Sequence, residues 1–210
     1  MSGGANRYPL RVIIFFMKLV HFVRHAEYEN PLGVLPGRLP MPLSEHGRTQ
    51  ADKLKQYFAS RKIDRIYSSA VLRCRQTSQI IANGKIPIQF DPRLLETFSA
   101  YQGFKPLAEG EWQEYAHVDE LGGETLSDQQ ARMVSFFEEL KSKNFQEVIV
   151  CSHGDPLYTL FLHIKNHPLP ANHAELMNQP GFEYQNKATV RTLRIDADTH
   201  GFDSIVSFVR

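Results

Sequence analysis

Short apolar runs alternate along this chain with longer stretches of helical periodicity. Segments 19–23 and 147–151 are apolar and rich in β-branched residues, which is typical of buried strands. Further strands are expected at 63–67, 87–90, 188–195 and 205–209, and helices after Ser44, over 70–82, after Thr125 or Ser127, and over 157–164. The alternation predicts an α/β fold, a three-layer α/β/α sandwich with a mostly parallel central sheet.

Size and charge narrow the class of protein. The 210 residues suffice for one well-buried core, so we expect a single catalytic domain over 17–210. The net charge of +1 gives no support to a nucleic-acid partner or to binding at a membrane surface. Two cysteines, Cys74 and Cys151, do not suggest a disulfide framework, and a reducing, cytoplasmic location is expected.

Residues 1–16 differ from the rest of the sequence. The uninterrupted apolar run before Lys18 is too short to span a bilayer, and no small-residue cleavage site follows it. We therefore expect 1–16 to be an N-terminal extension outside the domain, or else an additional strand.

Polar residues follow three of the expected strands. Arg24-His25 ends the first, Ser68-Ser69 the second, with Arg73 one helical turn further on, and Ser152-His153 ends a third. The carboxyl ends of parallel strands share one edge of a sheet, so these side chains should converge there. Arginine presents a planar fork to phosphate, and histidine can act as a nucleophile or base near neutral pH. No Walker-type glycine loop is present, so side chains would form the phosphate cradle.

The motifs resemble those of the histidine phosphatase superfamily, which has the phosphoglycerate mutase-like fold. Arg24-His25-Ala26-Glu27 resembles its RHGE signature, and Ser152-His153-Gly154 is similar to its second-histidine motif. Leu95-Glu96 with Gln102-Gly103 resembles its acid-bearing segment. The other stretches that match in order are 36–38, 42–47 with 50–51, 68–73 with Thr77, and 122–125 with Arg132.

The resemblance implies a metal-independent phosphatase that needs no cofactor and acts on a small phosphorylated substrate. His25 would attack phosphorus and become a phosphohistidine, which water then cleaves. Arg24, Arg73 and His153 would bind the phosphoryl oxygens, and Glu96 would protonate the leaving oxygen and later activate water.

Several assignments leave alternatives open. Asn30 and Arg38 are predicted to bind phosphate, against a purely structural role in the loop. The carboxylates that compete with Glu96 for the acid role are Glu27, Glu109, Glu111 and Glu114. His163 and His167 have a spacing that suits a metal, but the helix end before Pro168 favours solvated side chains.

Two other functions remain as alternatives: a phosphoglycerate mutase of the same fold, and a non-catalytic module that binds a phosphorylated ligand. Mutases of the family carry a longer insert between the acid and the second histidine, whereas the stretch from Glu96 to His153 is short. A binding module would lack the nucleophile or the second arginine, and both are present. Substrate identity is expected to reside in segments 98–124 and 166–185.

Overall fold

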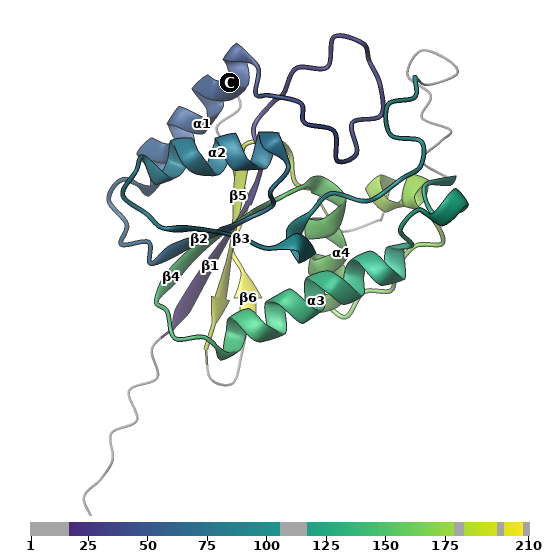
Figure 1. Cartoon of the computed structure of the whole chain (residues 1–210). Coiled ribbons are helices and arrows are strands. Elements are labelled where there is room, and N and C mark those ends of the chain that lie inside the picture. Colours follow the sequence, from purple (N-terminus) through teal and green to yellow (C-terminus); the bar gives the residue numbers. More distant parts are fainter. Residues whose placement is uncertain (1–16, 106–116, 179–182, 197–199, 208–210) are drawn as a thin grey trace, which may run out of the picture.

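The computed structural model describes residues 17–105, 117–178, 183–196 and 200–207, and within them a mixed, mostly parallel sheet (Figure 1). Its strands are β1 (Lys18–Arg24), β2 (Arg65–Ser68), β3 (Ile88–Phe90), β4 (Glu147–Ser152), β5 (Thr189–Ile195), β6 (His200–Phe202) and β7 (Val206–Ser207). The order is β3-β2-β4-β1-β5-β6, and β7 also pairs with β5. Strands β1 to β4 run parallel, whereas β5 is antiparallel to β1, β6 and β7.

Helices cover both faces of the sheet (Figure 1). On one face lie α1 (Glu45–Phe58) and α2 (Leu72–Ala82), and on the other α3 (Leu126–Ser142) and α4 (Gly154–Ile164). Short 3-10 helices are η1 (Pro92–Leu94), η3 (Glu120–Gly122) and η4 (His173–Asn178). None of the described helices combines the length and the apolar character needed to span a membrane.

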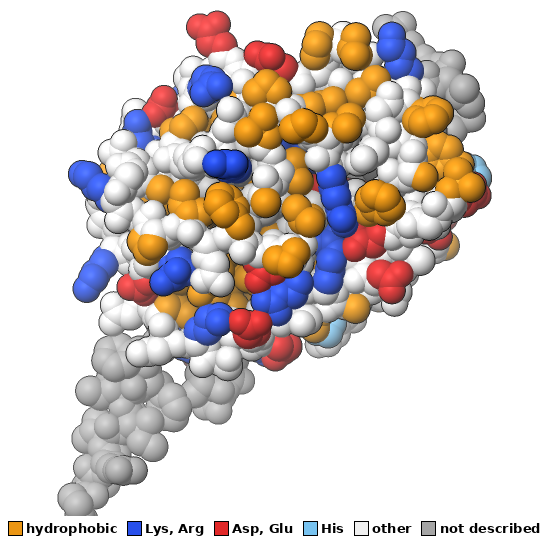
Figure 2. All heavy atoms as spheres, viewed as in Figure 1, with side chains coloured by type: hydrophobic (Ala, Val, Ile, Leu, Met, Phe, Trp, Pro, Cys, Tyr) orange, Lys and Arg blue, Asp and Glu red, His pale blue; other side chains and the backbone are white. Residues whose placement is uncertain are grey.

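Alternation along the strands produces one hydrophobic core on each side. Phe22 of β1 packs with Met133 of α3 and Phe161 of α4. Its neighbour Val23 faces the opposite side, in the cluster that contains Leu54 of α1 and Cys74 of α2. The expected three-layer α/β/α sandwich is therefore confirmed. Over the outside, basic, acidic and apolar side chains intermingle on the face shown in Figure 2.

Most element boundaries follow local signals. The Ser44 hydroxyl accepts a hydrogen bond from Gly47 N (3.0 Å) and caps α1, and Thr125, rather than Ser127, caps α3 by accepting from Asp128 N (3.0 Å). Helix α4 begins at Gly154, earlier than the apolar run 157–164 indicates. Strand β6 was not predicted, because its sequence His-Gly-Phe has no alternation to reveal it. The extension 1–16 and positions 208–209 of the last predicted strand lie outside the described residues.

The parallel strands bring the expected polar residues to one edge. Arg24 at the end of β1 is in register with Ser152 at the end of β4. On the other side of β4, Cys151 pairs with Ser68 at the end of β2. The three motif-bearing strand ends are thus neighbours, and the loops that leave them enclose a common site.

Candidate active site

Four of the predicted site residues form a continuous chain of contacts at this edge. Arg73 Nε lies 3.1 Å from His25 Nε2, and Arg73 Nη2 lies 3.2 Å from Glu96 Oε2. The same carboxylate oxygen is 3.4 Å from Nδ1 of His153, whose ring packs edge-on against His25 with centroids 5.1 Å apart. The structure therefore brings together residues from the end of β1, from α2, from the loop after η1, and from the N-cap of α4.

Hydrogen bonds fix the tautomer of His25. Its Nδ1 is 2.8 Å from the carbonyl oxygen of Ala26, which only accepts, so Nδ1 carries the proton. Nε2 is left with its lone pair and accepts from Arg73 Nε. Burial, and next the positive charges of Arg73 and Arg24, hold the pKa of His25 well below its usual range. A neutral imidazole with Nε2 as its basic atom is the form that a nucleophile needs.

Arg73 is fully buried, which is unusual for an arginine. Nη2 also donates to the carbonyl oxygen of Gly37 (2.8 Å), and the guanidinium packs on the ring of Tyr28 (5.1 Å). Nη1 is buried and has no hydrogen-bond partner within the described part of the chain. Two of the three guanidinium nitrogens thus hold Arg73 in place, and the third is a donor that the described protein groups do not use.

Arg24 is held by the segment that precedes β5. Nη1 donates to the carbonyl oxygen of Gln185 (2.8 Å), and the guanidinium stacks on the ring of Tyr184 (5.1 Å). Tyr184 in turn donates its hydroxyl proton to Asp155. Gly154 permits this approach, because a Cβ there would lie 2.0 Å from Tyr184 Oη and 3.0 Å from Arg24 Cζ.

The environment of Glu96 favours a protonated carboxyl. Oε1 accepts from the backbone N–H of Thr97 (3.0 Å), and the side chain is 17% exposed. Burial raises the pKa of Glu96, the neighbouring charge of Asp155 acts in the same direction, and Arg73 opposes both. Glu96 and Asp155 also line one small cavity with Leu35 and Ser99. A carboxyl whose pKa is raised and which borders open space can supply a proton to a bound group.

His153 is buried and uncharged in the same setting. Nε2 is 2.9 Å from the hydroxyl of Ser69, at the end of β2. Burial, together with the positive charge of Arg73, holds the pKa of His153 well below its usual range. The ring is therefore neutral near pH 7 and has its Nδ1 directed to Glu96.

Asn30 and Arg38, both predicted phosphate ligands, are used largely within the loops. The amide of Asn30 donates to Val34 O (2.8 Å) and accepts from Val34 N (3.1 Å), so both of its polar atoms brace the loop. Arg38 Nε donates to the backbone oxygen of Glu96 (2.7 Å), and its Nη2 lies 3.5 Å from Glu124 Oε2. Arg38 thus holds the backbone that carries the acid, and phosphate binding by either residue stays a prediction.

Of the carboxylates that compete with Glu96 for the acid role, the structure describes Glu27. Glu27 accepts a hydrogen bond from the Ser44 hydroxyl (2.9 Å) and is engaged at the start of α1. Glu109, Glu111 and Glu114 lie outside the described residues.

The predicted metal candidates, His163 and His167, lie apart from the site. His163 is exposed and His167 Nδ1 lies 3.0 Å from the carbonyl oxygen of Pro168. In the described ranges the donor atoms close enough to share an ion belong to His25, Glu96 and His153, within 4.8 Å of one another. The Arg73 guanidinium contacts two of these three residues, and a fixed cation at that point opposes a second one. The site therefore suits an anion better than a metal ion.

Two residues near the site were missed by sequence reasoning. The ring of Tyr28 packs edge-on against His25 (centroids 5.4 Å apart), and the ammonium of Lys187 lies 4.6 Å from the centre of the same ring. Neither belongs to a motif. Lys187 is distant from Tyr28 in sequence, so only the pairing of β5 with β1 reveals its position.

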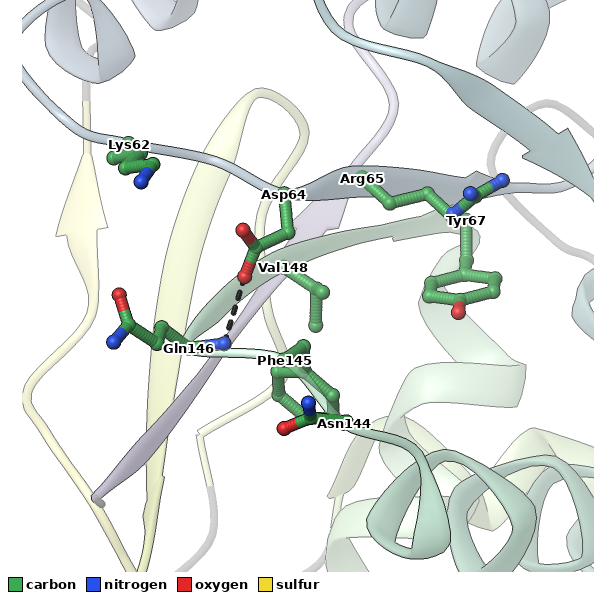
Figure 3. A pocket seen from close by; sticks show the side chains of 8 residues that line it. All are labelled: Lys62, Asp64, Arg65, Tyr67, Asn144, Phe145, Gln146 and Val148. Carbon is green, nitrogen blue, oxygen red and sulfur yellow. Dashed lines mark hydrogen bonds between the residues drawn. The ribbon is translucent and has the colours of Figure 1, made fainter.

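A wider hollow lies at the opposite edge of the sheet, where β2 and β4 begin (Figure 3). Its lining residues include Lys62, Arg65 and Phe145. Its carboxylate, Asp64, already accepts from the backbone N–H groups of Gln146 (2.7 Å) and Glu147 (3.2 Å). The hollow holds no histidine among its lining residues and offers no nucleophile comparable to His25.

Comparison with known proteins agrees with this geometry. The family model "Histidine phosphatase superfamily (branch 1)" matches residues 20–198. Phosphoserine phosphatase 1 of Hydrogenobacter thermophilus is 34% identical, over 69% of this chain and 74% of that protein. Among solved structures, Bacillus stearothermophilus YhfR superposes with a TM-score of 0.74 at 25% identity, covering 88% of this chain and 94% of that one. A phosphoserine phosphatase mutant of Entamoeba histolytica gives 0.71 at 18% identity, covering 90% and 96%.

Proposed function

Since this chain belongs to branch 1 of the histidine phosphatase superfamily and is a phosphomonoesterase, we propose that it acts without a metal, through a phosphohistidine formed on His25. The observation that carries this proposal is the fixed tautomer of His25, with Nδ1 bound to Ala26 O and Nε2 basic. We further propose that residues 17–210 form one catalytic domain. The two free, buried cysteines support a cytoplasmic location.

In the first step, the Nε2 lone pair of His25 attacks phosphorus, and the bond from phosphorus to the ester oxygen breaks. Arg73 Nε now donates to Nε2 and would turn to a phosphoryl oxygen when the ester binds, together with the unused Nη1. Arg24 supplies the second guanidinium. Once the ester is bound and Arg73 Nε has turned to it, these donors stabilise the charge that develops on the transferring group.

Glu96 supplies the proton that the leaving oxygen takes up. Its raised pKa keeps the carboxyl protonated at a higher pH than usual, and the carboxyl borders a small cavity. In the second step, the ionised carboxylate accepts a proton from water as the water oxygen attacks phosphorus. The bond from phosphorus to Nε2 breaks, inorganic phosphate leaves, and both residues return to their starting states.

Hydrolysis is favoured over the alternatives. A mutase must shield its phosphohistidine from water while the substrate reorients, and the short stretch between Glu96 and His153 offers little material for that. A binding module has no need of a basic Nε2 on a buried histidine. Small phosphorylated molecules are the proposed substrates, and phosphoserine is the first to test because a relative is phosphoserine phosphatase 1 of Hydrogenobacter thermophilus.

The test is phosphate release from phosphoserine and from nitrophenyl phosphate by the wild type and by His25→Ala. We expect turnover of at least one ester by the wild type and none by the variant, with an unchanged circular dichroism spectrum. Normal turnover by His25→Ala would overturn the nucleophile assignment. Isomerisation of 2- and 3-phosphoglycerate faster than phosphate release would identify a mutase instead.

A further inference from the structure

The segment before β5 is hydrogen-bonded at several points to β1 and to His25, which follows it. Ala188 N donates to the carbonyl oxygens of both Arg24 and His25, at 3.1 Å each. The Gln185 side chain donates to Phe22 O (3.0 Å), and its backbone oxygen accepts from Arg24. Lys187 lies between these anchoring residues, so its backbone position relative to the nucleophile is well defined.

Lys187 is a half-buried cation among other cations. Its ammonium packs on the Tyr28 ring, which also contacts the Arg73 guanidinium and the His25 ring. Among the described residues no carboxylate forms an ion pair with it. Burial, followed by the charge of Arg24, lowers the pKa of Lys187, and the attraction of Glu27 is a weaker opposing effect. Holding a third positive charge here is unfavourable unless an anion binds beside it.

The positive charge of Arg24, Arg73 and Lys187 together exceeds what the transferring phosphoryl group alone requires. Arg24 and Arg73 already provide two fixed positive charges for a phosphoryl dianion, and Arg73 retains an unused donor. Lys187 and His25 both contact the ring of Tyr28, with the lysine nitrogen 4.6 Å and the His25 centroid 5.4 Å from its centroid. When the phosphoryl group of a substrate lies against His25, the part of the substrate that reaches Lys187 would be a second group further along the molecule.

We propose that Lys187 binds a second anionic group of the substrate and thereby selects phosphomonoesters whose leaving group is itself negatively charged, as with a carboxylate. The inference rests on the proposed function, because the phosphoryl group must sit against His25. It assigns specificity to a residue outside the family motifs. Tyr28 supports the assignment, because its ring contacts both the Lys187 ammonium and the His25 ring.

The experiment compares binding of matched esters that differ in one charge. Ethyl phosphate is paired with phosphoglycolate, and glycerol 3-phosphate with 3-phosphoglycerate. Dissociation constants are measured by calorimetry in a His25→Ala background, so that no ligand is consumed. Lys187→Met is the test variant and Lys187→Arg the conservative one. Lys165→Met, which removes an exposed lysine stacked on Phe202, controls for the change in net charge.

In the background protein, the carboxylate ester of at least one pair should bind about 10-fold or more tightly than its neutral partner, as expected of a charge-assisted hydrogen bond. Lys187→Met should abolish that preference and change the dissociation constant of the neutral ester by no more than about threefold. Lys187→Arg and Lys165→Met should keep it. Equal affinities within both pairs, or equal losses for all four ligands, would overturn the role of Lys187. Phosphate release by the wild type tests the proposed function separately, because it does not depend on this preference.

Discussion

Replacing Glu96 with glutamine tests the proposed acid with little change in shape. The amide oxygen can still accept from Thr97 N, which now donates to Oε1 (3.0 Å). The amide nitrogen would take the position of Oε2, which faces Arg73 Nη2 at 3.2 Å and His153 Nδ1 at 3.4 Å. Glu96→Gln therefore removes the transferable proton and keeps the shape of the side chain, but it also loses the hydrogen bond that Oε2 accepts from Arg73, because an amide nitrogen donates.

The size of the loss should depend on the leaving group. Removing a general acid typically costs about 10²–10⁴ in rate, or about 3–5 kcal/mol, when the departing alkoxide needs a proton. Nitrophenolate departs without one, so its ester should lose about threefold or less. The contrast between the two classes should thus be at least about 30-fold for Glu96→Gln.

The assay is kcat/KM for a series of phosphomonoesters graded by the pKa of the leaving alcohol, measured for the wild type and for Glu96→Gln at one pH. We expect the variant to depend much more steeply on that pKa. If plots of log kcat/KM against the pKa of the leaving alcohol are parallel for the two proteins, with equal losses for alkyl and aryl esters, the acid role is refuted and a binding role is indicated. If the two plots coincide, another carboxylate supplies the proton to the leaving group.

Three further outcomes are expected. Excess EDTA should leave nitrophenyl phosphatase activity unchanged and vanadate should inhibit it as an analogue of the transferring group, whereas activity lost in EDTA and restored by zinc or magnesium would contradict the mechanism. Gly154→Ala should lower stability by about 1–3 kcal/mol in thermal melts and raise KM, because its Cβ would lie 2.0 Å from Tyr184 Oη, and an unchanged melting temperature and KM would contradict the close approach. The depressed pKa values of His25 and His153 mean that the unfolded chain binds more protons, so the free energy of unfolding should fall as pH drops below about 6.5, by up to about 1.4 kcal/mol per unit for each histidine. Urea melts from pH 7.5 to 5.5 check this slope, which should be shallower in His25→Ala.

Local patterns were enough to predict most of the fold. The apolar run that ends at Arg24 and the one that ends at Ser152 are continuous, so their strands and the shared edge follow from the sequence. Arg73 follows the Ser68-Ser69 strand end by about one helical turn, which brought it to the same edge. Strand β6 could not be predicted, since three residues without alternation pair only because β5 lies beside them.

The parts of the site that escaped prediction depend on long-range contacts. Nothing near Lys187 in sequence indicates that its ammonium would rest on Tyr28, because that contact requires β5 to pair with β1. The stacking of Arg24 on Tyr184 likewise depends on the absence of a side chain at Gly154. The tautomer of His25 is set by a backbone carbonyl, whose direction only the folded chain defines.

The most direct test of the account is to trap the intermediate and locate the phosphoryl group. Rapid mixing with a ³²P-labelled phosphomonoester is followed by denaturation at alkaline pH, where phosphohistidine survives, and by peptide mapping. The structure predicts label on His25, on Nε2 rather than Nδ1, because Nδ1 donates its proton to Ala26 O. Label on another residue, on Nδ1, or equally in His25→Ala would contradict the central claim.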